Sequence, residues 1–369
     1  MPNLIHNCFC WKLLVLIFMI TVGFVYNLKK NEQKPADTYL EWDDLETIKA
    51  IEGALSYNCR VISIDAGDDL LRKLSEVKDK IDILFNITEG GKGSWREAIV
   101  PIIAEELDIP YLGSDPATMV LCLNKQRTKE ILSFHNIKTP QFRVFTEIPK
   151  ITDGKQISLQ FPLVVKPAGE GSSKGIKNSS LVMDFKQCQN EIARIIQEYK
   201  QAALVEEFIS GREFTVAVLG NDPDIMALPL VEIDFTSLPE GAARLYSYEA
   251  KWVWDVPENP LDIFQCPAKV ESALAKRIRK TAINAYKVLG CRDWCRVDVR
   301  LDEEGNPYIL ELNPIPGILP KPEQNSCFPK AARAGGWNYT MLINIVLKIA
   351  CRRIGVKYEY DKKTADNIA

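Results

Sequence analysis

The chain has 369 residues, of which 46% are hydrophobic and 26% are charged, and its formal net charge is −3. This length accommodates about two or three domains, and the apolar fraction is sufficient to fill their cores. The slightly acidic balance excludes the basic surface that nucleic-acid binding requires. Two histidines and ten cysteines without zinc-binding spacing argue against a His-based metal site, a Ser-His-Asp triad and a disulfide framework. We therefore expect a reduced, cytoplasmic environment.

The apolar run from Leu13 to Tyr26 has two interpretations. It is shorter than the roughly 20 apolar residues of a transmembrane helix, although a membrane anchor over residues 9–26 is an alternative. Its second half, residues 21–26, is rich in β-branched and aromatic residues, which is typical of a buried strand. We favour the strand, because the segments that follow need it. For residues 1–18 we keep three interpretations: a membrane anchor, a signal peptide, or a start-site artefact. The third follows from the hypothesis that Met19 is the true start.

The segments up to residue 122 alternate between strand-like and helical patterns. The expected elements are, in order, strand 21–26, helix 44–55, strand 60–64, helix 69–77, strand 81–87, helix 94–107 and a short edge at 109–114. Their β-α-β-α-β order is typical of an α/β domain built on a parallel sheet.

The second half of the chain changes character, because strands now follow one another. After a helical stretch at 116–134, interrupted near residues 124–125, the expected elements are strands 142–145 and 163–165, helix 184–199, a run of antiparallel strands at 204–209, 213–219 and 226–234, helix 268–289, strands 296–301 and 308–312, and helix 339–351. This arrangement predicts an α+β region.

The two strands around residues 303–306 form a predicted hairpin that carries the strongest candidate site. Alternate side chains of a strand share a face, so Arg296 lies beside Asp298, and Glu311 lies beside Asn313 on the partner strand. The side chains expected to face the core are Val297, Val299, Leu310 and Leu312. Two carboxylates and an amide oxygen suit magnesium. A solvent-exposed polar hairpin is the alternative, which the Pro-rich sequence directly after Asn313 disfavours.

A glycine- and serine-rich loop follows the strand that ends at Lys166. Residues 169–175 include Gly171, Ser172 and Ser173, whose backbone N–H and hydroxyl groups are suited to phosphate oxygens. Lys166 supplies a point charge for the same phosphates. The sequence is not a Walker A loop, and a flexible surface loop is the alternative.

The stretch around residues 205–213 contributes weaker candidates. Glu206, Glu207, Phe208 and Glu213 are suited to an adenine amine and ribose hydroxyls, although acidic residues beside a glycine turn are commonly solvated. Lys125 and Lys251 are uninformative when taken singly.

Taken in order, these segments resemble the ATP-grasp superfamily, specifically its D-alanine–D-alanine ligase branch, over about residues 20–352. The blocks that carry the resemblance are Ile109–Ser114, Asn124-Lys125 with Thr128-Lys129, the Lys166 loop, Glu206–Phe208, Gly211–Val216, Tyr248–Lys251, Arg296–Val299, Glu311–Asn313, Pro316-Gly317 and Phe328–Ala332. The resemblance implies a Rossmann-like pre-ATP-grasp domain (19–122), a small ATP-grasp subdomain with a phosphate lid (123–205), a large subdomain with the metal site (206–356) and a polar tail (357–369).

The resemblance also implies a role for each candidate residue. Lys125 and Lys166 would hold the phosphates of ATP, and residues 169–175, with Gly171, Ser172 and Ser173, would close over them. Glu206, Glu207 and Phe208 would meet the adenine, Glu213 the ribose, and Lys251 the γ-phosphate. Asp298, Glu311 and Asn313 would bind two magnesium ions, with manganese as a substitute. Arg296 and the Gly317 backbone would stabilise the oxyanion of the tetrahedral intermediate, and Lys251 and Ser172 complete the set of expected catalytic residues.

The substrate side departs from the branch. Members of the branch usually open the first strand into a loop with a glutamate that anchors the ammonium of the first amino acid, whereas here Asn27-Leu28-Lys29-Lys30 follows. The tyrosine expected after Lys251 is Trp252, and a His-Gly segment is replaced by Thr88–Glu97. Lys29, Lys30, Lys92 and Arg96 hint at an acidic first substrate, and plain solvation of these residues is the alternative.

We therefore predict an ATP- and magnesium-dependent carboxylate–amine ligase that works through an acyl phosphate. A ligase for another amino acid or acidic substrate is the first alternative, and a non-catalytic ATP-binding protein is the second. The expected partners are small amino acids or carboxylates, without nucleic acid, and a homodimer is compatible with the resemblance.

Overall fold

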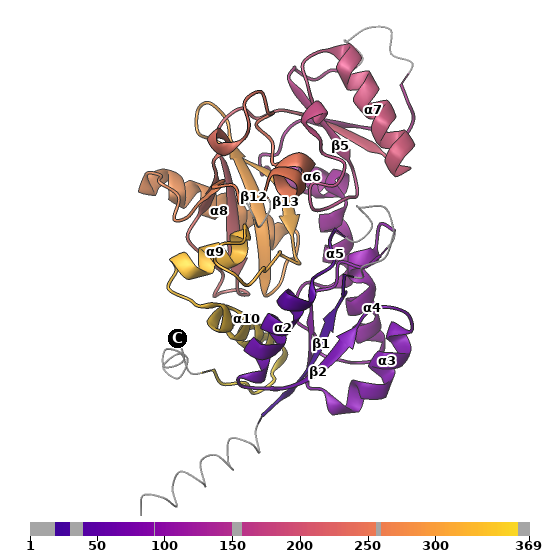
Figure 1. The fold of residues 1–369 in the computed structure, drawn as a ribbon, viewed down its shortest axis with the longest axis vertical. Coiled ribbons are helices and arrows are strands. Elements are labelled where there is room, and N and C mark those ends of the chain that lie inside the picture. The colour runs from indigo at the N-terminus through magenta and orange to yellow at the C-terminus, as the bar shows by residue number, and fades with distance from the viewer. Residues whose placement is uncertain (1–18, 30–39, 92, 150–156, 256–259, 361–369) are drawn as a thin grey trace, which may run out of the picture.

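The computed structural model describes residues 19–29, 40–91, 93–149, 157–255 and 260–360, and the chain forms three sheets within these ranges. Figure 1 shows a parallel sheet with its helices at one end, a small sheet with one long helix at the other, and a large sheet beside and between them. The α/β class and the ATP-grasp arrangement predicted above are confirmed. The predicted leader, residues 1–18, lies outside the described ranges.

The N-terminal domain has the predicted β-α-β-α-β order. Its elements are β1 (Thr21–Tyr26), α2 (Leu45–Ser56), β2 (Arg60–Asp65), α3 (Leu70–Val77) and β3 (Ile83–Asn86). β1 lies between β2 and β3 and is parallel to both. Val22, Phe24 and Val25 are fully buried, as a central strand of a covered parallel sheet requires.

Because residues 21–26 form β1, they cannot belong to a membrane-spanning helix. The alternative of an anchor over residues 9–26 is therefore wrong for its second half, and residues 9–18 lie outside the described ranges. Within the described part of the chain, no helix combines the length and the apolar character needed to cross a membrane.

The end of the domain is less regular than the pattern predicted. The helix expected over 94–107 is a short 3₁₀ turn, Arg96–Ala98, that leads into α4 (Ile99–Glu106). The expected edge at 109–114 reduces to one bridge between Leu84 and Tyr111. The predicted helix was too long at its start, where Arg96 and Glu97 form tertiary contacts instead of a regular helical turn.

The small subdomain is an antiparallel sheet in the order β4-β7-β5-β6. It is preceded by α5 (Pro116–Leu123) and α6 (Lys125–Phe134), and its elements are β4 (Phe142–Phe145), β5 (Leu163–Pro167), β6 (Leu181–Val182), α7 (Phe185–Tyr199) and β7 (Ala203–Glu207). α7 packs on β5 and β7, and its apolar side chains form a separate core with them.

The large sheet has the order β11-β10-β8-β12-β13, with β9 paired to β8. Its strands are β8 (Glu213–Leu219), β9 (Met226–Ala227), β10 (Val231–Ile233), β11 (Phe264–Gln265), β12 (Trp294–Leu301) and β13 (Pro307–Asn313). The prediction that 204–209 and 213–219 belong to one run of strands is wrong, because β7 pairs with β4 and β5. The turn at 208–212 therefore connects two sheets that face a common cleft.

The remaining helices are α8 (Ser272–Val288), α9 (Cys327–Ala334) and α10 (Tyr339–Ile354). α10 packs on α2, and Asn344 donates a hydrogen bond to the Ala54 carbonyl at 2.8 Å, so the C-terminal helix completes the N-terminal domain (Figure 1). Residues 357–360, predicted as the start of a polar tail, also pack here: Tyr358 and Tyr360 are buried. Residues 361–369 lie outside the described ranges.

Asp293 connects three parts of the fold. Its buried carboxylate accepts hydrogen bonds from Gly113 N at 2.8 Å, from Asn221 Nδ2 at 2.8 Å and from Arg353 Nη2 at 2.7 Å. These partners lie after the parallel sheet, after β8 and in α10. A buried carboxylate that accepts this many hydrogen bonds joins the three parts of the fold, and its loss would leave several buried donors without a partner.

We predict that Asp293→Asn lowers the free energy of unfolding by about 3 kcal/mol, because the charge opposite Arg353 is lost while the side-chain shape is kept. Denaturant unfolding measures the change. Asp224→Asn is the matched control, since it removes a carboxylate from an exposed pair with Arg352 and is expected to cost less than about 1 kcal/mol. Equal effects of the two substitutions would contradict the role of Asp293 as a junction.

Candidate active site

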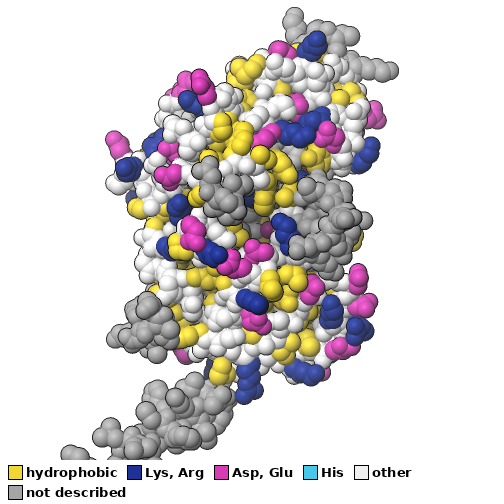
Figure 2. Space-filling model, viewed as in Figure 1, with side chains coloured by type: hydrophobic (Ala, Val, Ile, Leu, Met, Phe, Trp, Pro, Cys, Tyr) yellow, Lys and Arg dark blue, Asp and Glu magenta, His cyan; other side chains and the backbone are white. Residues whose placement is uncertain are grey.

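A wide cleft runs between the small and large sheets, and at its inner end a narrower cavity of about 60 Å³ reaches the N-terminal domain. On the face shown in Figure 2, acidic and basic side chains are interspersed over the middle of the molecule without a continuous patch of one sign. All of the predicted catalytic, nucleotide and metal residues line the cleft or the cavity: Lys125, Lys166, Gly171, Ser172, Ser173, Glu206, Glu207, Phe208, Glu213, Lys251, Arg296, Asp298, Glu311, Asn313 and Gly317.

The predicted hairpin is present and carries the candidate metal ligands. β12 and β13 pair in antiparallel register, with Arg296 opposite Asn313 and Asp298 opposite Glu311. Val297 and Val299 are fully buried on the other face, as predicted. A bulge after Asp298 shifts the register, so that Ile309 enters the core while Leu310 lines the cleft. The prediction that Leu310 faces the core is therefore wrong.

The carboxylates of the hairpin are held by cations. Arg296 Nη2 lies 3.0 Å from Asp298 Oδ2, and Asn313 Nδ2 lies 3.3 Å from the same oxygen. Lys125 Nζ lies 3.1 Å from Glu311 Oε2. Burial alone would raise the pKa of Glu311, but Lys125 and Lys166 lower it below its usual range. This side chain is therefore an anion at neutral pH.

These side chains fit a divalent hard cation, because all three present oxygen donors towards the cleft. The described residues contain no group of three or more His, Cys, Asp or Glu side chains arranged to hold a metal ion. The two carboxylates and one amide would thus be an incomplete ligand set, which leaves positions for phosphate oxygens.

A second charged cluster lies on the small sheet. The Glu206 carboxylate bridges Lys166 Nζ at 2.5 Å and Lys129 Nζ at 2.8 Å, and all three side chains are buried. Lys129 also donates to Thr139 Oγ1 at 2.8 Å. Burial lowers the pKa of Lys129 to about 8, an effect that Lys166 reinforces and Glu206 opposes.

Lys129 had no predicted role, although its position in the sequence carries a signal. α6 begins at Lys125, with Asn124 as its N-cap, and residues four positions apart share a helical face. Lys129 therefore had to lie on the same side as Lys125. Its contact with Glu206 fixes the carboxylate that in turn orients Lys166.

The glycine- and serine-rich loop lies against the N-terminal domain. Arg96 Nη1 donates to the Gly169 carbonyl at 3.0 Å, and Arg96 Nη2 lies 3.2 Å from Glu41 Oε2 and 3.6 Å from Glu170 Oε2. A Cβ at Gly171 would stand 2.6 Å from the Glu41 carboxylate, so a larger residue here would displace the Glu41 side chain. Trp252 Nε1 donates to the Ser172 carbonyl at 3.1 Å.

These contacts remove Arg96 from the four residues that hint at an acidic first substrate. Arg96 is 5% exposed and its charge is matched by Glu41 and Glu170, so it is neither solvated nor available to a substrate carboxylate. Lys29 lies near the Trp252 ring, 6.0 Å from its centroid, and Lys30 and Lys92 are outside the described ranges.

The remaining predicted residues lie at the two ends of the cleft. Lys251, in the π-helical turn Ala250–Trp254, points into the cavity, and burial together with Arg296 lowers its pKa. Gly317 lines the same cavity, and its carbonyl accepts a hydrogen bond from Ser326 Oγ at 2.9 Å. At the other end, Glu213 pairs with Arg300 at 2.9 Å, and Arg300 lies over the Phe208 ring.

Comparison with known proteins agrees with this geometry. Residues 123–348 match the family model described as the C-terminus of D-Ala–D-Ala ligase. The D-alanine–D-alanine ligase of Pelotomaculum thermopropionicum is 32% identical, covering 85% of this chain and 93% of the relative. The uncharacterized protein y4sG of Sinorhizobium fredii is 38% identical, covering 73% of this chain and 75% of the relative.

Solved structures share the fold. The D-alanine–D-alanine ligase of Bacillus anthracis in complex with ATP superposes with a TM-score of 0.68 at 23% identity, covering 90% of this chain and 98% of that one. The VanG D-Ala:D-Ser ligase of Enterococcus faecalis gives a TM-score of 0.68 at 22% identity, covering 90% and 99% of the two chains.

The fold and the cleft thus define an ATP-grasp enzyme, an ATP-dependent ligase that joins a carboxylate to an amine. The chain belongs to the D-alanine–D-alanine ligase family. The family and the enzyme class expected from the sequence are both confirmed, and the alternative of a non-catalytic ATP-binding protein is not favoured.

The pH dependence of stability tests the environment of Glu213. Burial raises its pKa from 4.5 to about 7, although Arg300 opposes the shift. Between these values the folded protein binds more protons than the unfolded chain, so the free energy of unfolding falls as the pH rises. We predict that Glu213→Gln reduces the loss between pH 4.5 and pH 7 by up to about 3 kcal/mol.

Denaturant unfolding at the two pH values measures this difference. Glu240→Gln, at an exposed position, is the control and should leave the pH dependence of the wild type unchanged. An equally steep loss in Glu213→Gln would show that Glu213 is not the group that titrates.

Proposed function

We propose that this protein phosphorylates the carboxylate of one amino acid and then joins it to the amine of a second, with ATP and two magnesium ions. The observation that carries the proposal is the set of Asp298, Glu311 and Asn313, facing a cleft whose opposite wall holds Lys166. Manganese would fit the same oxygen donors. The curated relatives named D-alanine–D-alanine ligase make D-alanine the first amino acid to test.

In the first step, a carboxylate oxygen of the first substrate attacks the γ-phosphorus and ADP leaves. Lys125 and Lys166 would hold the phosphates, while residues 169–175 would cover them and exclude water. Lys251 would neutralise the transferring phosphoryl group, since positioning and charge neutralisation account for most of such catalysis. Asp298, Glu311 and Asn313 would hold magnesium, which would neutralise part of the negative charge of the phosphates.

In the second step, the amine nitrogen attacks the acyl carbon, inorganic phosphate leaves, and the amine loses a proton. Arg296 and the Gly317 N–H would stabilise the oxyanion of the tetrahedral intermediate. Arg296 lies 3.8 Å from Glu311 and 3.0 Å from Asp298, so its charge is fixed beside the ligands before any substrate arrives. Such preorganisation is what lowers the barrier in a site shielded from water.

The nucleotide end would be formed by the other predicted residues. Glu206, Glu207 and Phe208 border the cleft at the end of β7, and Glu213 borders it at the start of β8. Glu206 forms ion pairs with both Lys129 and Lys166. We therefore propose that Glu206 orients Lys166, in addition to contacting the adenine. A homodimer and a cytoplasmic location remain predictions, and light scattering on the purified protein tests the first.

Phosphate release tests the proposed activity. Purified protein with ATP and magnesium is incubated with pools of D-amino acids, L-amino acids and dicarboxylates. We expect release that depends on an amino-acid pool. Tight ATP binding without release in any pool would contradict the proposal and restore the non-catalytic alternative, and release with dicarboxylates alone would support an acidic substrate.

We predict that Asp298→Asn and Glu311→Gln each lower kcat by at least about 100-fold, because each removes charge that binds the metal ions. Phosphate release at saturating ATP measures the loss. Glu303→Gln is the control, since Glu303 lies in the exposed turn of the same hairpin and should retain wild-type turnover. Wild-type turnover in either ligand variant would overturn the metal assignment.

A further inference from the structure

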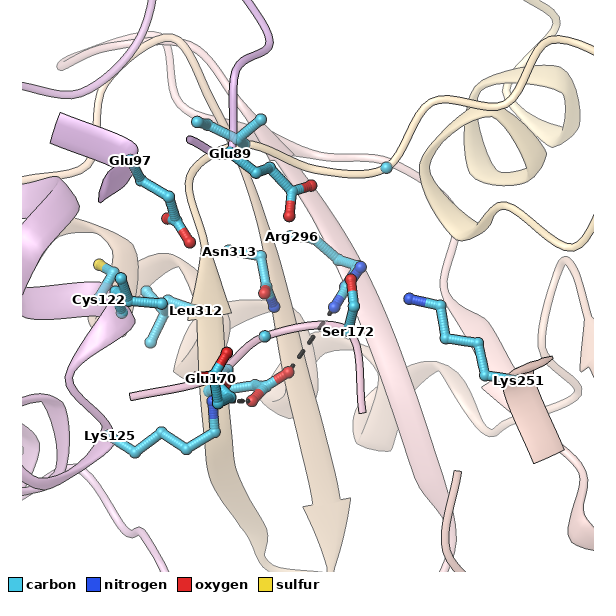
Figure 3. A pocket seen from close by; sticks show the side chains of 15 residues that line it. Glu89, Glu97, Cys122, Lys125, Glu170, Ser172, Lys251, Arg296, Leu312 and Asn313 are labelled. Atoms are coloured by element: carbon cyan, nitrogen blue, oxygen red, sulfur yellow. Dashed lines mark hydrogen bonds and ion pairs between the residues drawn. The ribbon is translucent and has the colours of Figure 1, made fainter. Parts of the chain in front are cut away.

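Arg300, near the end of β12, is a buried cation that the proposed reaction steps do not use. Figure 3 shows Lys125 and Lys251 beside the inner cavity, where the phosphates and metal ions would lie. Arg300 lines the wide cleft instead, together with Phe208 and Glu213. It is only 2% exposed, and a charge buried this deeply requires fixed partners.

The Arg300 guanidinium donates hydrogen bonds to three separate segments of the chain. Nη1 donates to Glu213 Oε2 at 2.9 Å, Nη2 to the Arg244 carbonyl at 2.9 Å, and Nε to the Gly211 carbonyl at 3.3 Å. Arg300 and Glu213 are directly opposite each other in the antiparallel pair of β12 and β8, so the register of the strands brings the two side chains together. The plane of the guanidinium is therefore fixed.

Two aromatic rings also contact this guanidinium. Arg300 Cζ lies 4.4 Å from the centroid of the Phe208 ring and 5.2 Å from that of the Phe235 ring. A cation over an aromatic ring is attracted to it, and more strongly where water is excluded. Phe208 follows β7 of the small sheet and borders the cleft. Arg300 thus restricts the position of a ring that lies between the two sheets.

The turn between β7 and β8 is packed directly against the end of β12. Gly211 N donates to the Leu301 carbonyl at 3.0 Å, and Leu301 N donates to the Arg212 carbonyl at 2.9 Å. A Cβ at Gly211 would stand 2.4 Å from the Leu301 carbonyl oxygen. Because that oxygen belongs to the backbone of a central strand, only glycine fits here. The contacts of Arg300 therefore rest on a rigid support.

Glu213 keeps one carboxylate oxygen for a ligand. Arg300 occupies Oε2, while Oε1 accepts no hydrogen bond from any residue within the described ranges. Burial raises the pKa of Glu213, and Arg300 opposes this rise by favouring the carboxylate. An ionised carboxylate that is held on one side is a strong acceptor for a hydroxyl group on the other.

We propose that Arg300 is a positioning residue for the nucleoside part of ATP, which holds the Glu213 carboxylate and the Phe208 ring in place for the ribose and the adenine. This inference rests on the function proposed above, which assigns the ribose to Glu213. Arg300 acts through these two side chains and not on the reacting atoms. The fork of the guanidinium is required in addition to its charge, because a lysine ammonium cannot match three acceptors arranged around a planar group.

Nucleotide binding tests this role independently of turnover. Wild type, Arg300→Met and Arg300→Lys, each with magnesium, are titrated calorimetrically with ATP, 2′-deoxy-ATP and 3′-deoxy-ATP. We expect the wild type to bind ATP roughly 10-fold more tightly than at least one deoxy analogue, because the analogue lacks a hydroxyl that donates to a charged acceptor. Arg300→Met should lose most of this preference, and Arg300→Lys should lose part of it.

A double-mutant cycle shows whether Arg300 acts through Glu213. Glu213→Gln alone should lose most of the preference for ATP, and adding Arg300→Met should then change it by less than about twofold. The double variant removes both members of the buried pair, so neither charge is left without a partner. Equal effects of Arg300→Met with and without Glu213→Gln would contradict a role that acts through this carboxylate.

Arg212→Met is the matched control. Arg212 pairs with Glu232 at 2.6 Å and lies over the Phe214 ring at 5.1 Å, but it is exposed and does not line the cleft. Its replacement should leave the preference within about twofold of the wild type, and thermal unfolding confirms that each variant is folded.

Two results would overturn the assignment. One is an Arg300→Met protein that discriminates between ATP and the deoxy analogues as the wild type does. The other needs no Arg300 variant to fold: a wild type that binds both deoxy analogues as tightly as ATP. Phosphate release that depends on an amino-acid pool, together with either result, would leave the proposed ligase activity standing.

Discussion

Charges that are buried between two sheets must be matched, and this constraint determines how the cleft is built. An unpaired buried charge costs several kcal/mol, while a pair whose members are both fixed costs much less. Glu206 therefore holds Lys129 and Lys166 on the small sheet, and Lys125 reaches across to Glu311 on the large one. These ion pairs set the positions of the lysines before ligands bind. Phosphate oxygens would then replace carboxylates as partners of the lysines, and metal ions would replace lysines as partners of the carboxylates.

The same constraint connects the cleft to the N-terminal domain. Arg96 is buried where the parallel sheet meets the glycine- and serine-rich loop, and it joins Glu41, Glu170 and the Gly169 carbonyl. The position of the glycine- and serine-rich loop and the arrangement of charges beside the inner cavity are therefore linked through one guanidinium. Behind this contact, Asp293 joins the N-terminal domain to β8 and α10, so the cleft is supported from both sides.

The sequence predicted what depends on local pattern. Alternation of side chains identified the hairpin and placed Asp298 beside Arg296, and the helical periodicity and turn residues placed most helices and strands within a few residues. Long-range pairing was not predictable in this way. β7 and β8 follow each other closely, yet they belong to different sheets, and nothing local in residues 208–212 distinguishes this turn from a hairpin. The bulge that brings Leu310 into the cleft shifts the register between β12 and β13. No glycine in this part of the hairpin indicates the bulge in the sequence.

The residues predicted for the nucleotide and metal half lie together along the cleft and the cavity, because their types and order are specific, and their individual roles stay predictions. The substrate half depends on which charges are matched, and matching is a property of the folded molecule. Arg96 looked available to an acidic substrate, but the fold surrounds it with carboxylates.

The central claim is that a substrate carboxylate attacks the γ-phosphate within this cleft. An amino acid labelled with ¹⁸O in its carboxylate, supplied with ATP, magnesium and the acceptor amine, tests it directly. The account predicts that one ¹⁸O atom per turnover appears in the released inorganic phosphate, because the acyl C–O bond breaks when the amine attacks. Phosphate released without the label would mean that water is the nucleophile, which would contradict an acyl-phosphate ligase.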